Sequence, residues 1–219
     1  MRSRAVISLA LLLSLLLVPS IEVAMGQEDE DSEPLTCGSI LKLQHASSGY
    51  RLHSHSVNYA SGSRQQSVTG YAGAEDSNSF WIIRSSAAVP GGCVQGAELK
   101  AGDSVRLQHM STRRFLHSHR HNAPLSPQLQ EVSAFGDDSG ELSDQGDDWV
   151  LESVSSPSGS RLTVDSKLRL RHVATDHYLS TSMQTFGHPI PGQMEIVAKA
   201  SKGRDTVWKP AEGIFYPLV

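Results

Sequence analysis

The stretch Leu41-Lys42-Leu43-Gln44-His45 decides the fold, because the chain repeats it twice. Val105-Arg106-Leu107-Gln108-His109 and Leu168-Arg169-Leu170-Arg171-His172 follow the same pattern, and the three histidines are 64 and 63 residues apart. In each copy apolar and polar residues alternate, and a period of two predicts a β-strand. We therefore expect one structural unit that is used three times.

A polar turn and a second strand follow each copy of this stretch. Seven residues after the repeat histidine the three units carry Leu52, Leu116 and Leu179. Alternating strands joined by short polar turns predict β-hairpins. Each unit ends on an apolar strand with a single tryptophan, and these residues are Trp81, Trp149 and Trp208. We interpret the three tryptophans as one shared core layer, since a large ring fills the space between sheets.

Three units of roughly four short strands each predict an all-β protein of about 12 strands. A single unit is too small to bury a core, but three units around a pseudo-threefold axis can do so, and this arrangement is a β-trefoil. The expected repeats are about 36–90, 98–153 and 160–212, within a domain that spans 36–216. A propeller is disfavoured, because propellers use roughly four or more blades.

The N-terminal residues have the pattern of a secretory signal peptide. Arg2 and Arg4 precede an apolar run from Ala5 to Val18, and Ala24-Met25-Gly26 supplies the small residues of a cleavage site. The run is shorter than the roughly 20 apolar residues that span a membrane. We predict a signal peptide at 1–26, an acidic tail at 27–35 and a soluble mature protein. An uncleaved membrane anchor is the alternative.

Charge and cysteine content narrow the functional classes. The sequence has 19 Lys and Arg against 23 Asp and Glu, a net charge of −4, so it does not indicate the basic surface that nucleic-acid binding requires. Cys37 and Cys93 follow the signal peptide, and the secretory pathway is oxidising enough to hold a disulfide. We predict that they pair, and two free buried thiols are the alternative.

Candidates for catalysis are sparse in this sequence. It shows no nucleophile–base pair, carboxylate pair or phosphate-binding loop, so we expect neither an enzyme nor a cofactor. Each repeat histidine comes two residues after a leucine of its strand, so the two side chains lie on the same face. The histidines therefore point inward or lie at a strand end. We expect buried structural residues that donate to backbone carbonyls, and these are His45, His109 and His172.

Histidines spaced two apart in the second strands are the main surface candidates. This spacing places imidazoles on one face of a strand, where they can bind Zn²⁺, but the third unit has Ser180 and Ser182 instead. We therefore predict no metal site and interpret the set as a polar edge. The candidate surface for a partner or a glycan also includes one tyrosine and an acidic loop, and it consists of His53, His55, Tyr59, His117, His119, His121, Asp137 and Asp138.

Several longer motifs resemble the MIR domain, a module named for protein mannosyltransferases, inositol trisphosphate receptors and ryanodine receptors. They include Arg51-Leu52-His53-Ser54-His55, Asp76-Ser77-Asn78-Ser79-Phe80-Trp81 and Glu131-Val132-Ser133-Ala134-Phe135-Gly136. The resemblance covers residues 36–216. Among proteins with this module, the chain is similar to the stromal cell-derived factor two family.

This resemblance implies a non-catalytic protein of the endoplasmic reticulum lumen. Members of the family act with a J-domain co-chaperone and the lumenal Hsp70 on unfolded clients, in protein quality control and the unfolded protein response. The chain ends in Phe215-Tyr216-Pro217-Leu218-Val219 rather than a Lys/His-Asp-Glu-Leu retention signal. We therefore predict that a partner retains the protein in the lumen, and secretion is the alternative. The alternative function is a lectin-like module that recognises glycans such as O-mannose.

Overall fold

Twelve β-strands form the described part of the chain, which comprises residues 32–86, 89, 93–136 and 144–216 of a computed structural model. The strands are β1 (Ile40–His45), β2 (Arg51–Asn58), β3 (Gln66–Tyr71), β4 (Trp81–Ser85), β5 (Ser104–His109), β6 (Phe115–Asn122), β7 (Gln130–Phe135), β8 (Trp149–Ser153), β9 (Leu168–His172), β10 (Tyr178–Thr185), β11 (Met194–Lys199) and β12 (Trp208–Ile214). Short 3-10 helices precede the last strand of each repeat, namely η1 (Ser77–Ser79), η2 (Gln145–Asp147) and η3 (Arg204–Thr206).

The all-β prediction of about 12 strands is confirmed, with four strands in each repeat. The predicted signal peptide and most of the acidic tail lie outside the described residues. Within the described ranges, no helix has the length and apolar character needed to cross a membrane.

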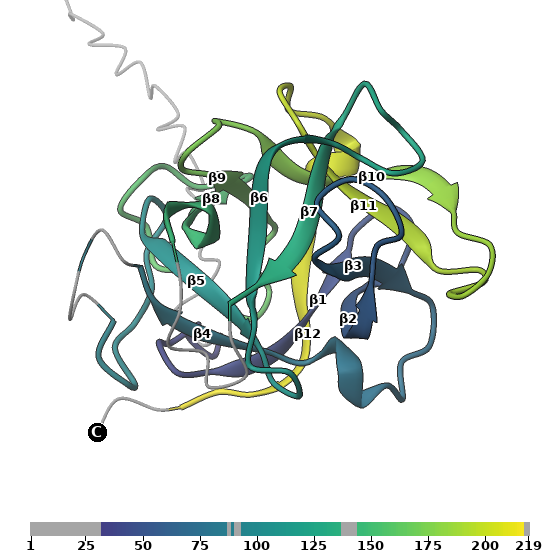
Figure 1. The fold of residues 1–219 in the computed structure, drawn as a ribbon. Helices are drawn as coiled ribbons and strands as arrows, with labels where there is room; N and C mark the ends of the chain where they lie inside the picture. The colour runs from purple at the N-terminus through teal and green to yellow at the C-terminus, as the bar shows by residue number, and fades with distance from the viewer. Residues whose placement is uncertain (1–31, 87–88, 90–92, 137–143, 217–219) are drawn as a thin grey trace, which may run out of the picture. The chain divides into compact units, whose positions relative to one another are not determined.

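Six of the strands form a closed barrel in which pairing runs from β1 through β4, β5, β8, β9 and β12 back to β1. The other six form the hairpins β2–β3, β6–β7 and β10–β11. The inner hairpin strands also pair with one another, β3 with β7, β7 with β11 and β11 with β3, which closes a ring. Figure 1 shows the hairpins gathered beside the barrel strands. This is the predicted β-trefoil, and its closure leaves few open strand edges.

The alternating pattern of the repeat holds in the barrel except at two polar positions that are buried, Lys42 in β1 and Gln108 in β5. In β9 the leucines and the final histidine are buried while the two arginines are partly exposed. In β1, however, Lys42 stands at a polar position of the pattern and is only 4% exposed. Its ammonium group donates to the Ala74 carbonyl and lies 4.6 Å from the centroid of the Phe80 ring. The segment before β4 therefore covers this face of β1, and local alternation does not contain that information.

Three fully buried tryptophans, one from each repeat, lie in the core: Trp81, Trp149 and Trp208. Each indole N–H donates to a backbone carbonyl at 2.9 Å, and the acceptors are Leu52, Leu116 and Leu179. Each acceptor belongs to the hairpin of the same repeat. The tryptophan thus joins the barrel strand of its repeat to that hairpin and leaves no buried donor unpaired.

The predicted disulfide between Cys37 and Cys93 is present, with 5.4 Å between the two Cα atoms. It connects the segment before β1 to the segment after β4, so it closes the first repeat. Backbone hydrogen bonds hold the same region, from Cys37 to the carbonyl of Ala97 at 2.9 Å and from Gly38 to that of Ile83 at 3.0 Å.

Candidate functional site

The three repeat histidines lie at the junctions between repeats. Each Nε2 bonds a carbonyl in the 3-10 helix of the neighbouring repeat at 2.9–3.0 Å, and these carbonyls belong to Asp205, Asn78 and Gly146 for His45, His109 and His172. A carbonyl only accepts, so Nε2 carries the proton. Nδ1 then accepts from a hydroxyl three residues further on, at 2.7–2.9 Å, and the hydroxyls belong to Ser48, Thr112 and Thr175.

Burial keeps these histidines neutral. It lowers the pKa of His45, and it lowers the pKa of His109 and His172 to about 4, although the bond to a backbone carbonyl opposes the shift in each case. Each ring also packs against a tryptophan, with centroids 4.8–5.1 Å apart. Both ring nitrogens are therefore engaged within the fold, and the sites serve contact between repeats rather than proton transfer.

The second-strand histidines of β6 form a hydrogen-bonded chain between two fully buried carboxylates. His117 Nδ1 lies 2.9 Å from Asp147 Oδ1, His117 Nε2 lies 3.2 Å from His119 Nδ1, and His119 Nε2 lies 3.0 Å from Glu131 Oε1. Burial raises the pKa of Glu131, but hydrogen bonds from His119 and Ser63 outweigh it and hold that pKa below its ordinary value. The chain therefore ends on an ionised carboxylate inside the hairpin ring.

The first repeat contains a shorter version of this chain. His53 Nδ1 lies 2.7 Å from Asp76 Oδ2, and His53 Nε2 lies 3.2 Å from His55 Nδ1. The place of Glu131 is taken here by Ser67, and within the described ranges His55 Nε2 is buried without a hydrogen-bond partner. In the third repeat Ser180 replaces the first histidine and donates to a backbone carbonyl of η3 at 2.6 Å.

Only part of the predicted candidate surface is exposed. His53 and His117 are 3% and 4% exposed, because η1 and η2 pack over them. The prediction that Tyr59 lies on this surface is wrong, because its side chain is 5% exposed. Its hydroxyl donates to the carbonyls of Val68 and Val132 at 2.8 and 3.0 Å, inside the hairpin ring. The structure leaves His121 exposed and His55 and His119 partly exposed, while Asp137 and Asp138 lie outside the described residues.

A polar groove of about 600 Å³ lies where β6 faces the turn after β9. We define it by the side chains of His119, Arg120, Gln145 and Thr175. A neighbouring hollow of about 320 Å³ shares Arg120 and Thr175 and is also lined by His121. His119 and His121 therefore border one polar region between the second and third repeats, whereas His55 lines neither hollow.

His117 and Asp144 line the polar groove, and the fully buried Asp147 lies behind them. The ligand atoms of these three residues lie within 4.8 Å of one another, so they are candidate cation ligands. Their present contacts account for the arrangement. The backbone N–H of Asp144 donates to Asp147 at 2.9 Å, and the carboxylate of Asp144 accepts from Gly146 at 2.7 Å. The first of these bonds, together with a bond from the backbone N–H of Asp147 to the Asp144 side chain, forms a capping box for η2. We therefore assign the two carboxylates to helix capping and to His117.

The carboxylates that hold the histidines are the residues that sequence reasoning missed. Asp76 and Asp147 precede the tryptophan of their repeat by five and two residues, so they do not occupy equivalent positions. A repeat alignment therefore hides them. The residue types could have indicated these contacts. An acidic residue comes shortly before each of the first two tryptophans, and a histidine pair occurs in the second strand of the same repeat.

Residues 50–148 match the family model of the MIR domain. Together with the trefoil fold and its repeated tryptophans and histidines, this match places the chain in the class of MIR β-trefoils. The chain is 44% identical over 196 residues to the stromal cell-derived factor 2-like protein of Arabidopsis thaliana, covering 89% of this chain and 85% of that one. It is 44% identical over 181 residues to human stromal cell-derived factor 2, covering 83% and 82%. The chain belongs to the stromal cell-derived factor 2 family.

Solved structures agree with this assignment. The crystal structure of the SDF2-like protein from Arabidopsis thaliana has a TM-score of 0.79 and 43% identity, covering 84% of this chain and 98% of that one. A chain of the S. cerevisiae protein O-mannosyltransferase complex bound to the sugar donor has a TM-score of 0.74 and 34% identity, covering 84% of this chain and 26% of that one. The same trefoil thus occurs within a much longer chain.

Proposed function

We propose that this protein is a non-catalytic subunit of an endoplasmic reticulum chaperone complex. It acts with a J-domain co-chaperone and the lumenal Hsp70 on unfolded clients, in quality control and the unfolded protein response. Family membership supports this proposal, and so does the use of the histidines and carboxylates described above in internal hydrogen bonds. Such a function requires a surface that binds another protein.

The observation that carries the proposal is Met183 in β10. Its side chain is 60% exposed and its φ is 64°, a left-handed conformation that costs an L-residue roughly 1–2 kcal/mol. The equivalent positions in the other two repeats are Ser56 and Arg120. Methionine is enriched at protein interfaces, and backbone strain is concentrated at functional positions. The third hairpin is therefore the candidate docking surface for the co-chaperone.

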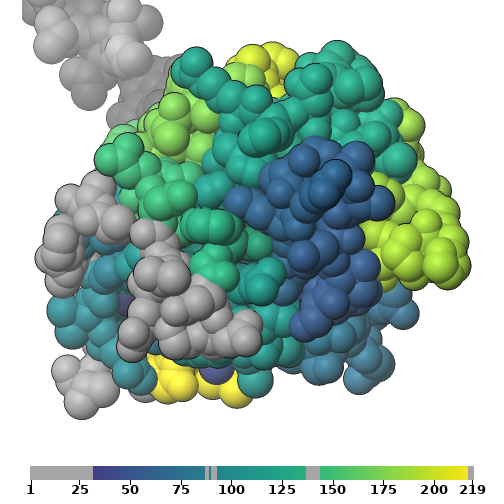
Figure 2. All heavy atoms as spheres, in the orientation of Figure 1, coloured from purple at the N-terminus to yellow at the C-terminus, as the bar shows by residue number. Residues whose placement is uncertain are grey.

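Contacts with the other two repeats hold this hairpin in place. The ring of Phe186 packs against that of Tyr59 at 5.9 Å, and Gln184 Nε2 donates to Ser126 Oγ at 2.8 Å. Figure 2 shows the yellow-green third hairpin bordering the blue segment of the first repeat. A docking residue on a fixed hairpin loses little conformational entropy when it binds.

Binding of the purified co-chaperone tests this surface. We expect Met183→Ser to weaken the complex roughly fivefold or more, since hot-spot truncations cost more than about 1 kcal/mol. Met110→Ser is the matched control, because Met110 is 46% exposed at the turn after β5 and lies outside the third hairpin. If Met183→Ser and the wild type bind the co-chaperone with equal affinity, the third hairpin is not the docking surface. Failure of the wild type to recover a J-domain protein and Hsp70 from lumenal extract would overturn the proposed function itself.

The proposed location is the endoplasmic reticulum lumen, where the co-chaperone retains the protein. Cell fractionation checks this proposal directly. Co-purification with lumenal markers is the expected result, and depletion of the co-chaperone should shift the protein to the medium. Recovery of nearly all of the protein from the medium of untreated cells would contradict retention.

Glycan recognition is the second candidate function, and the polar groove is the observation that favours it. Its volume of about 600 Å³ and its hydrogen-bonding side chains suit a sugar, which presents many hydroxyl groups. A glycan array with wild type and Gln145→Ala, together with co-chaperone pull-down after glycosidase treatment, separates the two functions. Co-chaperone recovery that survives deglycosylation, with no glycan bound on the array, eliminates the lectin function.

A further inference from the structure

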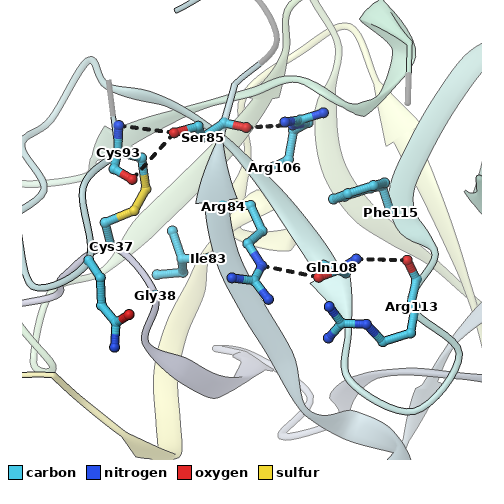
Figure 3. Close-up of a pocket in the computed structure, with 11 residues that line it drawn as sticks. Cys37, Gly38, Ile83, Arg84, Ser85, Cys93, Arg106, Gln108, Arg113 and Phe115 are labelled. Carbon is cyan, nitrogen blue, oxygen red and sulfur yellow. Dashed lines mark hydrogen bonds between the residues drawn. A yellow bond between two sulfur atoms is a disulfide. The ribbon is translucent and has the colours of Figure 1, made fainter. Parts of the chain in front are cut away.

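A pocket of about 390 Å³ lies at the junction between the first and second repeats, and its volume falls in the roughly 300–1,000 Å³ range of ligand sites. Figure 3 shows it between the Cys37–Cys93 disulfide and the strands β4 and β5. The disulfide, Ile83 and Phe115 supply apolar parts of the wall. Three arginines supply the charge, and they are Arg84, Arg106 and Arg113.

The Gln108 amide lies between two of these arginines. Arg84 Nε donates to Gln108 Oε1 at 3.1 Å, and Gln108 Nε2 donates to the carbonyl of Arg113 at 3.0 Å. Figure 3 shows both guanidinium groups beside this amide. Burial, followed by the positive charge of Arg113, lowers the pKa of Arg84. Two like charges are thus held near one neutral side chain.

The equivalent junction between the second and third repeats has the opposite charge arrangement. There Glu152, Arg171 and Asp176 occupy the places of Arg84, Gln108 and Arg113. The strand register supports this equivalence, because Arg84 pairs with Arg106 in β5 as Glu152 pairs with Arg169 in β9, and both partners lie three residues before the repeat histidine. Arg171 Nε lies 2.9 Å from Glu152, and Arg171 Nη1 lies 3.0 Å from Asp176. One cation between two carboxylates forms a closed set of ion pairs.

The first junction instead presents two cations around a neutral amide. Among the residues that the structure describes, no carboxylate forms an ion pair with Arg84 or Arg113, whereas Arg51, Arg161 and Arg171 each have one. The two guanidinium groups therefore retain donors for an external oxyanion. Arginine is suited to this role, because its planar fork matches a carboxylate with two parallel hydrogen bonds.

The backbone of Arg113 is a second, independent indication. Its φ is 62°, and the equivalent residues Asp176 and Gly49 have φ values of 59° and 77°. Glycine adopts this region without cost and aspartate is enriched there, whereas a long side chain is uncommon. Arg113 thus stands at a turn position that its own conformational preference disfavours, and strained positions of this kind are concentrated at binding sites.

We propose that this pocket binds the carboxylate of an acidic peptide segment. Arg84 and Arg113 donate charge-assisted hydrogen bonds to the carboxylate, while the apolar wall at Ile83 and Phe115 contacts the methylene groups next to it. This wall favours a carboxylate on an aliphatic stem over a bare inorganic ion. The site lies on the first junction and does not depend on the docking surface around Met183.

Fluorescence anisotropy with two labelled peptides tests the ligand class. We expect the full chain to bind an acetylated Glu-Leu-Glu-Glu peptide roughly tenfold more tightly than its Gln-Leu-Gln-Gln counterpart, because only the first presents side-chain carboxylates. Binding should weaken when salt rises from about 50 to about 200 mM, as screening requires. Absence of binding, equal affinity for both peptides, or displacement by equimolar inorganic phosphate would each overturn the assignment.

Three variants locate the binding to the pocket. Arg113→Gly introduces the residue that the first repeat already uses at this turn, so it preserves the fold and should cost roughly fivefold or more in affinity. Arg64→Gly is the matched control, because Arg64 is exposed, has a φ of 61° and carries the same charge elsewhere on the surface. Arg84→Gln removes the second cation without changing the turn.

A triple variant places the charged side chains of the second junction at the equivalent positions of the first junction. Arg84→Glu, Gln108→Arg and Arg113→Asp together recreate a cation between two carboxylates, so the fold should be retained and peptide binding abolished. Thermal unfolding of every variant separates lost binding from lost structure. Equal loss of affinity in Arg64→Gly and Arg113→Gly would mean general charge attraction, and unchanged affinity in Arg84→Gln would remove the pocket as the site.

Discussion

The ring of His109 lies 5.0 Å from the ring of Trp81, and the two residues are directly opposed in the strand pair that joins β5 to β4. The same imidazole bonds the carbonyl of Asn78 in the first repeat and the hydroxyl of Thr112 in its own repeat. One buried side chain thus connects two repeats by a ring contact and one hydrogen bond, while the second hydrogen bond holds the ring within its own repeat. Equivalent contacts at the other junctions make these histidines central to the stability of the trefoil.

Replacement of this histidine should destabilise the protein strongly. We expect His109→Ala to lower the free energy of unfolding by about 3 kcal/mol, since it leaves a cavity and an unsatisfied buried carbonyl. Urea denaturation followed by tryptophan fluorescence measures the change. His121→Ala is the control, because His121 is exposed, and it should stay within about 0.5 kcal/mol of the wild type. Equal effects of the two substitutions would contradict the structural role of His109.

Stability should fall as pH decreases below 6.5. The folded protein lowers the pKa of His109 and His172 to about 4 by burial, whereas the unfolded chain has the ordinary value of 6.5. Above pH 6.5 both states are unprotonated at these residues, and between 6.5 and 4 only the unfolded state binds the protons. Stability is therefore complete above the unfolded pKa and decreases by up to about 1.36 kcal/mol per histidine and pH unit below it.

Thermal unfolding between pH 7 and 5 measures this dependence, because most carboxylates titrate at lower pH. We expect Tm to fall by several degrees over this range. A His172→Asn variant, which is less stable at pH 7, should show a shallower slope. A wild-type Tm that is constant from pH 7 to 5 would show that these histidines do not exclude protons in the folded state.

The hydroxyl of Tyr59 should contribute to stability, although a tyrosine near a turn looks like a surface residue. Tyr59→Phe removes a donor to the carbonyls of Val68 and Val132, and these belong to strands of two different repeats. We expect a loss of about 1–3 kcal/mol, the cost of leaving buried acceptors unsatisfied. Tyr71→Phe serves for comparison, because Tyr71 is 39% exposed, and it should change the free energy of unfolding by less than about 0.5 kcal/mol.

Loss of the disulfide should destabilise the chain without changing its fold. The bridge joins residues 56 apart in sequence, and the chain-entropy argument gives a contribution of about 4 kcal/mol for a loop of this size. Urea denaturation of a double variant, Cys37→Ala with Cys93→Ala, measures the loss. Unchanged circular dichroism is expected below the transition. A difference below about 1 kcal/mol would show that other contacts already restrain the two segments.

The threefold architecture could be predicted from local patterns, because each repeat carries its own copy of the information. The period-two alternation before His45, His109 and His172 indicated strands, and the equal spacing of the copies indicated a pseudo-threefold axis. The disulfide followed from two cysteines in a chain with a secretory signal pattern. These features require only sequence order and residue type.

The candidate site could be predicted less well, since its chemistry depends on residues from different repeats. The two-residue spacing of His117 and His119 did predict neighbouring imidazoles, but not the carboxylates at either end of the chain, Asp147 and Glu131. Tyr59 was assigned to the surface because nothing local shows that the hairpin ring closes over it.

The sequence by itself determined the class of fold and the three-part organisation, since hydrophobic alternation is a local property, and it predicted the pairing of Cys37 with Cys93 that the structure confirms. Only the tertiary structure decided which polar side chains are buried and which charged side chains form no ion pair within the described ranges. Arg84 and Arg113 are 29 residues apart in the sequence and meet beside Gln108 because β4 pairs with β5 across a repeat junction. Burial and electrostatic balance depend on distances in space, and the closure of the trefoil sets those distances.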